Sequence, residues 1–140
     1  MRPKFSCFFA FLTLLLFAGC ETVKFSSSQV TQLSIQEGPT SLSKRTFSSP
    51  SEVSEIMACL DRAVLMESDS EQVSQQLLHG YILEIVGAKP VSGTWLYDKT
   101  EGRFSRNQSY KKSYYVLRPF DRDRVNAIVF KELNTKMTDR

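Results

Sequence analysis

Few side chains in this sequence could carry out catalysis. His79 is the sole histidine, so a serine–histidine–acid or cysteine–histidine arrangement would depend on it. It precedes Gly80 among leucines, a setting typical of an ordinary histidine at a turn or a strand end. A zinc site takes several histidine or cysteine ligands, and beyond the first twenty residues only Cys59 accompanies His79. We therefore expect no catalytic residue, no metal ligand and no cofactor.

Asp121 and Asp123 could suggest an acid–base pair or part of a cation-binding loop. They alternate with Arg122 and Arg124, and the glycine of a calcium-loop pattern is missing. Helix capping and surface ion pairs account for both aspartates.

Basic and aromatic side chains are interleaved between Arg103 and Arg124. Such a mixture can bind nucleic acid through phosphate contacts and stacking. In a cell envelope it could instead meet anionic lipid, glycan or an acidic protein, with tyrosine and arginine as anchors. An alternative is a set of strands whose aromatic residues point inward and whose basic residues are solvated. The residues that we predict to contact a partner are Arg103, Arg106, Tyr110, Lys111 and Lys112.

An apolar run near the start of the sequence predicts export. Arg2 and Lys4 precede the run from Phe8 to Phe17, and Ala18-Gly19 separates it from Cys20. A basic start, an apolar core of about 7 to 15 residues and a small-residue cleavage site are the three parts of a signal peptide. The run is too short for a bilayer span, which takes roughly 18 to 20 apolar residues.

These residues resemble the signal sequence of a bacterial lipoprotein. The lipobox of that class is commonly Leu, a small residue, Gly or Ala, then Cys, and this sequence has Phe17-Ala18-Gly19-Cys20. The resemblance implies that Cys20 receives a diacylglyceryl group on its sulfur, is released by cleavage after Gly19 and is then acylated on its new amino group. Two or more acyl chains hold a protein stably at a membrane. The resemblance therefore implies a lipid anchor at Cys20.

The residue after the cysteine narrows the expected location. Glu21 stands where aspartate is the usual inner-membrane retention signal of enterobacterial lipoproteins, so we expect the outer membrane, with the protein facing the periplasm. Export argues against nucleic acid as a partner. With Cys7 removed and Cys20 acylated, Cys59 would be the one remaining thiol, so no intramolecular disulfide can form. An intermolecular disulfide is the alternative.

The 121 residues that follow residue 19 suffice for one compact domain and a tether. Their charge is distributed unevenly. Residues 20–88 hold four lysines or arginines and nine acidic residues, whereas residues 89–140 hold twelve and six. This asymmetry gives a directional field that can orient the domain toward an anionic surface.

The sequence divides into a signal peptide over residues 1–19, a tether over 20–45 and a periplasmic domain over 46–140. The second part is rich in Ser, Thr and Gln and predicts a flexible tether. The alternative is that Gln29 to Gln36, with apolar Val30, Leu33 and Ile35, docks as an edge strand.

Periodicity predicts the elements of the domain. Ser49 to Glu52 has capping-box spacing with Pro50 at the first helical position, and apolar residues then recur at helical spacing, so we expect a helix over 50–66. Polar residues 67–76 predict a loop. Strands are expected at 81–86, 94–97 and 113–118, with a loop from Asp98 to Asn107. A helix is expected over 121–134, although Ala127 to Phe130 would also serve as a strand.

The expected fold class is α+β, a small single domain in which a helix is followed by a three- or four-stranded antiparallel meander and a C-terminal helix. We expect no enzyme. The predicted role is a non-enzymatic accessory or assembly factor that binds another envelope protein of a secretion, pilus or conjugation apparatus. The alternative is an inhibitor, immunity or exclusion lipoprotein acting against a lytic enzyme, phage or plasmid, with the loop from Asp98 to Asn107 inserted into a cleft.

Overall fold

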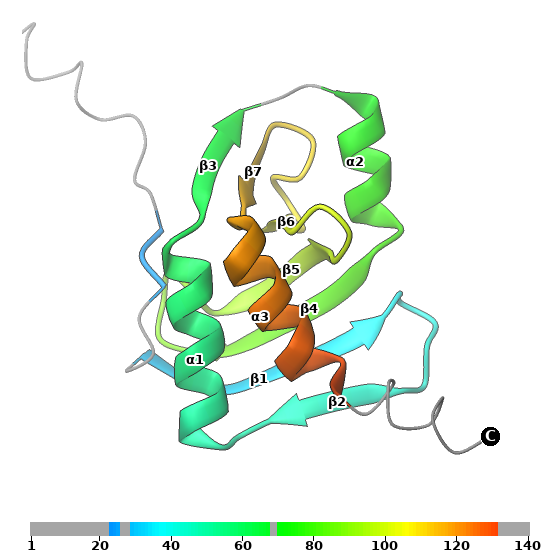
Figure 1. Cartoon of the computed structure of the whole chain (residues 1–140). Helices are drawn as coiled ribbons and strands as arrows, with labels where there is room; N and C mark the ends of the chain where they lie inside the picture. Colours follow the sequence, from blue (N-terminus) through cyan, green and yellow to red (C-terminus); the bar gives the residue numbers. More distant parts are fainter. Residues whose placement is uncertain (1–22, 26–28, 68–69, 132–140) are drawn as a thin grey trace, which may run out of the picture.

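A computed structural model describes residues 23–25, 29–67 and 70–131. These residues form an antiparallel sheet of seven strands in the order β2-β1-β4-β5-β6-β7-β3 (Figure 1). The strands are β1 (Val30–Glu37), β2 (Lys44–Phe47), β3 (Val64–Glu67), β4 (Tyr81–Gly87), β5 (Gly93–Asp98), β6 (Arg103–Arg106) and β7 (Ser113–Val116). The helices are α1 (Pro50–Asp61), α2 (Glu71–Leu78) and α3 (Pro119–Val129). The class is α+β, but the expected meander of three or four strands is wrong.

Helices cover both faces of this sheet. Successive side chains of a strand point to opposite faces, and β5 uses both of them. Trp95 and Tyr97 belong to the main core with α1 and α3. Leu96 belongs to a smaller cluster, with Leu77 of α2 and Tyr114 of β7. The packing therefore has α1 and α3 on one face, where they run side by side in Figure 1, and α2 on the other.

The expected tether is wrong from Val30 onward, because β1 lies inside the sheet. It pairs with β4, where Leu33 faces Ile85 and Ile35 faces Leu83. It also pairs with β2, so the alternative of an edge strand is wrong as well. The edge positions belong to β2 and β3.

The first predicted helix begins correctly and ends too late. Pro50 is at the first turn of α1, and Ser49 precedes it without a side-chain capping bond, so the expected capping box does not form. The helix ends at Asp61, and Val64 then starts β3 instead of extending the apolar stripe. Val64 pairs with Val116 and Leu65 with Tyr115. Strand pairing with β7 thus outweighs the local helical spacing.

Two elements were missed in segments that look polar. The predicted loop over 67–76 contains most of α2, whose buried residues are Ser74 and Leu77. The predicted loop from Asp98 to Asn107 contains β6, and only residues 99–102 connect it to β5. Gly102 makes this tight connection with a φ of 67° and donates its N–H to the carbonyl oxygen of Asp98 (2.9 Å). The segment is therefore a hairpin rather than a loop that extends into a cleft.

The remaining predictions agree with the structure. The strands expected at 81–86, 94–97 and 113–118 are confirmed as β4, β5 and β7. The last element is the preferred helix, although it starts two residues early at Pro119. Its expected residues 132–134 lie outside the described residues. None of the helices described is long and apolar enough to cross a membrane.

Replacing Gly80 with alanine is expected to lower the free energy of unfolding by about 3 kcal/mol, the upper part of the range for overpacking. A β-carbon at Gly80, between α2 and β4, would lie 2.3 Å from the carbonyl oxygen of Tyr97. Gly38→Ala is the control, because a β-carbon there meets nothing within 4 Å and costs only backbone strain of about 1 kcal/mol at a φ of 68°. Urea unfolding of both variants checks this, and equal losses would contradict the packing at Gly80.

Candidate functional site

The predicted partner-binding residues do not form one surface. Arg103 and Arg106 lie three positions apart in β6, so their side chains point to opposite faces of the sheet. Arg103 donates a hydrogen bond to Gln76 Oε1 of α2 (2.6 Å). Arg106 lies 4.7 Å from the ring centroid of Trp95 on the face of α1 and α3. Both arginines thus contact groups of their own fold.

The other three predicted residues lie in the connection between β6 and β7. Tyr110 packs against the small cluster beneath α2, and the Lys111 ammonium lies 5.9 Å from its ring centroid. Lys112 is exposed. Arg103, Tyr110 and Lys111 therefore belong to the α2 face, and a partner for that surface stays a prediction.

The two side chains considered for catalysis, His79 and Cys59, lie in an exposed and in a buried position. His79 is exposed at the end of α2, where its N–H donates to the Gln75 carbonyl oxygen (3.0 Å). Cys59 is buried, and this burial is the main reason that the pKa of its thiol is raised. A high thiol pKa favours the unreactive protonated form. Within the described ranges, no three His, Cys, Asp or Glu side chains are grouped to hold a metal ion.

Asp121 is a buried ion-pair partner rather than a helix cap. The residue before the helix is Arg118, and Asp121 Oδ1 accepts hydrogen bonds from Arg62 Nη2 (2.5 Å) and Nε (3.0 Å). These bonds are the main reason that the pKa of the Asp121 carboxyl lies below its ordinary value. The pair connects the end of α1 to the start of α3. Asp123 instead contacts Arg122 at the surface.

Asp121→Asn is expected to destabilise the fold in a pH-dependent way. A carboxyl whose folded pKa is lowered contributes its full stabilisation above the unfolded value, about 3.9, and loses it as the pH falls through the folded value. The difference in urea midpoint between wild type and variant should therefore be largest near neutral pH and shrink below about pH 4. Asp123→Asn is the matched control, since its side chain is 69% exposed. A difference that stays constant on acidification would contradict this assignment.

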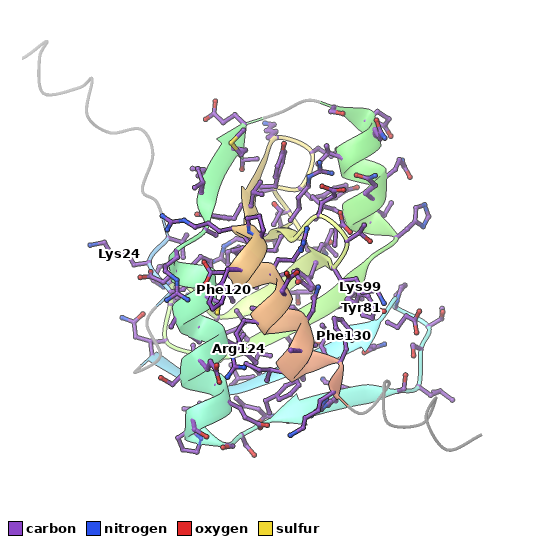
Figure 2. All side chains as sticks on the ribbon, viewed as in Figure 1. Lys24, Tyr81, Lys99, Phe120, Arg124 and Phe130 are labelled. Carbon is purple, nitrogen blue, oxygen red and sulfur yellow. The ribbon has the colours of Figure 1, made fainter. Side chains whose placement is uncertain are left out.

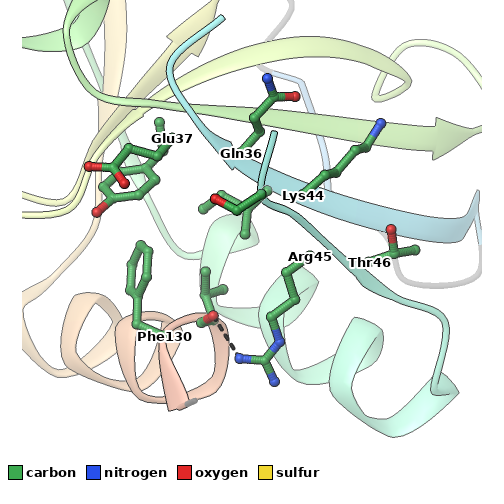
Figure 3. A pocket seen from close by; sticks show the side chains of 10 residues that line it. Gln36, Glu37, Lys44, Arg45, Thr46 and Phe130 are labelled. Carbon is green, nitrogen blue, oxygen red and sulfur yellow. Dashed lines mark hydrogen bonds between the residues drawn. The ribbon is translucent and has the colours of Figure 1, made fainter. Parts of the chain in front are cut away.

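A pocket of about 450 Å³ opens where β1 and β2 meet the end of α3 (Figure 3). Small-molecule and cofactor sites commonly have volumes of about 300 to 1,000 Å³. The apolar lining consists of Ile35, Tyr81, Val129 and Phe130, and the polar lining includes Gln36, Glu37, Lys44 and Arg45. The sequence did not predict this pocket, because β1 and the first two residues of β2 were assigned to a tether.

Cationic groups surround the pocket. Arg45 Nη1 donates to the carbonyl oxygen of Val129 (2.9 Å), at the end of α3 where the helix dipole is negative. Lys99 lies 5.3 Å and 5.1 Å from the ring centroids of Tyr81 and Phe130 (Figure 2). Lys44 is paired with Glu84 (2.5 Å). Among the described contacts, Arg45 and Lys99 thus meet a carbonyl oxygen and aromatic rings and form no ion pair, while Glu37 adds a carboxylate to the lining.

Residues 23–25 are part of the folded domain. The Val23 N–H donates to the Tyr115 hydroxyl oxygen (3.2 Å), and the Phe25 N–H donates to Asp61 Oδ1 (3.0 Å). The Phe25 ring is 3% exposed and makes edge-on contacts with three aromatic rings, at centroid distances of 5.2 to 5.6 Å. These rings are those of Trp95, Phe104 and Tyr115. The predicted signal cleavage and lipidation residues, Gly19 and Cys20, lie outside the described residues.

The region around Phe25 and the pocket therefore lie at opposite ends of α3. Its start is joined through Asp121 and Arg62 to the end of α1, where Phe25 is held by Asp61. Its end lines the pocket. Eleven residues at 1.5 Å each separate the two ends by roughly 16 Å.

Comparisons with protein-family models, with curated proteins and with solved structures found no match.

Proposed function

We propose that this chain is a lipoprotein of the outer membrane, anchored through Cys20 and facing the periplasm, which acts as a non-enzymatic accessory or assembly factor by binding another envelope protein. The observation that carries the proposal is the placement of the pocket. It lies at the end of α3 remote from Val23 to Phe25, the described residues nearest to Cys20. An anchored domain would thus present the pocket to the periplasm, where a partner protein has access.

The chemistry of the pocket favours a protein segment with apolar and acidic side chains. Tyr81 and Phe130 supply aromatic surface, and aromatic residues are common anchors of protein interfaces. Arg45 and Lys99 supply positive charge that a carboxylate of the partner can complement.

Site-specific crosslinking in cells tests this proposal. A photoreactive amino acid replaces Ser43, an exposed residue of the pocket rim, and Leu78, an exposed residue of α2, in separate variants. We expect a crosslink to one envelope protein from position 43 and none from position 78. Equal crosslinks from both positions, or none from position 43, would remove the support for the pocket as the contact.

A charge reversal distinguishes the pocket from the surface predicted from sequence. Lys99→Glu should lower the crosslinking yield from position 43 by about tenfold, the effect of a change of 1.4 kcal/mol in binding free energy. Lys112→Glu is the matched control, since it makes the same charge change in the connection between β6 and β7. If Lys112→Glu abolished the crosslink and Lys99→Glu did not, the partner would bind the connection between β6 and β7 and the pocket would be excluded.

A further inference from the structure

The distance between the proposed acylation site and the folded domain is very short. Three peptide units join Cys20 to Val23, and fully extended chain spans at most about 3.6 Å per residue. The Cα atoms of these residues can thus be no more than about 11 Å apart. Val23 and Phe25 are bonded to Tyr115 and Asp61. A domain anchored at Cys20 must therefore lie against the bilayer rather than at the end of a tether.

The surface around Val23 exposes apolar side chains. The Phe120 side chain, in the first turn of α3, is 78% exposed (Figure 2). Its neighbour Asp121 is bonded to Arg62 at the end of α1, and Asp61 in turn holds Phe25. Val64, two residues after Arg62, is exposed on the edge strand β3. These contacts place exposed apolar groups at the end of the domain where the chain arrives from Cys20.

The same surface exposes basic groups, and two of its carboxylates are engaged in hydrogen bonds, while Glu67 at the last position of β3 is exposed. Lys24 and Arg118 are exposed, and Lys24 points away from the domain in Figure 2. The carboxylates of Asp61 and Asp121 accept hydrogen bonds from Phe25 and from Arg62. Basic residues close to a membrane are attracted to anionic lipid headgroups, and aromatic side chains favour the headgroup region.

We propose that the end of α1, the start of α3 and the edge strand β3 form a membrane-docking face, with Phe120 among the lipid headgroups and Lys24 and Arg118 near lipid phosphates. This inference rests on the proposed acylation of Cys20. We assign the face to the bilayer rather than to a second protein, because the short segment between Cys20 and Val23 keeps the domain within reach of the lipid surface.

Lipid quenching of tryptophan fluorescence tests the docking face. The full-length acylated protein carries either Phe120→Trp or Leu42→Trp and is reconstituted into vesicles of phosphatidylethanolamine and phosphatidylglycerol, with and without lipids brominated on their acyl chains. Leu42 is the control because it is fully exposed in the connection between β1 and β2. The native Trp95 is 1% exposed and gives a constant background. We expect loss of most of the added emission for Phe120→Trp and no loss for Leu42→Trp.

Charge reversal tests the basic groups of the docking face. Lys24→Glu with Arg118→Glu, added to Phe120→Trp, should weaken the quenching. An unquenched tryptophan at position 120, which is the result expected if another protein covers this face, would overturn the inference. Equal quenching at positions 120 and 42 would also overturn it.

Intact mass of the same preparation separates the docking face from the lipid anchor. Absence of acyl mass would remove the anchor, whereas an acylated protein without quenching at position 120 would remove only the docking face.

Discussion

Replacing Phe25 with alanine is expected to lower the free energy of unfolding by about 3 to 5 kcal/mol, the usual cost of removing a buried phenylalanine ring. The ring is 3% exposed and contacts Trp95, Phe104 and Tyr115 in the main core. Its removal leaves a cavity among three aromatic rings that cannot close without moving the sheet. Urea unfolding, followed by circular dichroism in a Cys20→Ser background that needs no detergent, measures the change.

Lys24→Ala is the control for this prediction. Lys24 precedes Phe25 and is exposed, so its truncation should change the unfolding free energy by less than about 0.5 kcal/mol. If Phe25→Ala cost no more than Lys24→Ala, residues 23–25 would not be part of the folded domain. The short connection to Cys20, and with it the membrane-docking face, would then be lost.

Cys20→Ser, in a chain whose residues 1–19 are replaced by a signal peptide that is cleaved without acylation, is expected to transfer the protein almost completely from the membrane fraction to the soluble fraction. Each buried methylene of an acyl chain contributes about 0.8 kcal/mol to membrane binding, so several chains account for stable anchoring. The exposed groups of the docking face are too few to replace them. Cys59→Ser is the matched control, because it removes a buried thiol and should leave the protein in the membrane fraction. A Cys20→Ser protein that stays with the membrane would contradict an acyl anchor.

The elements that were predicted correctly have strong local patterns. β4 consists of β-branched, aromatic and aliphatic residues from Tyr81 to Val86, interrupted only by Glu84. α1 has Pro50 at its start and buries Val53, Ile56 and Leu60 on one face. In these segments local preference and burial agree. The local sequence pattern therefore sufficed to place β4 and the start of α1.

The elements that were missed depend on partners far away in the sequence. β1 has only Leu33 and Ile35 at its centre among Ser, Thr and Gln, and its strand form is stabilised by pairing with β4, about fifty residues later. β3 continues the helical spacing of α1 through Val64, yet pairing with β7 makes it a strand. Local sequence patterns carry no information about such long-range strand pairing.

The pocket could not be predicted for the same reason. Arg45 and Val129, which form its hydrogen bond, are 84 positions apart. The basic and aromatic run from Arg103 to Arg124 was recognised correctly as a pattern, but strand alternation divides it between two faces. The sequence therefore shows which basic and aromatic residues are present, and the fold determines which of them lie together.

Intact mass spectrometry of the wild-type protein extracted from membranes is the decisive test of the lipid anchor. We expect a chain that begins at Cys20 and carries added acyl mass, which is absent from the Cys20→Ser variant. A chain that retains residues 1–19, or one that begins at Cys20 without acyl mass, would contradict the lipid anchor and both proposals that depend on it.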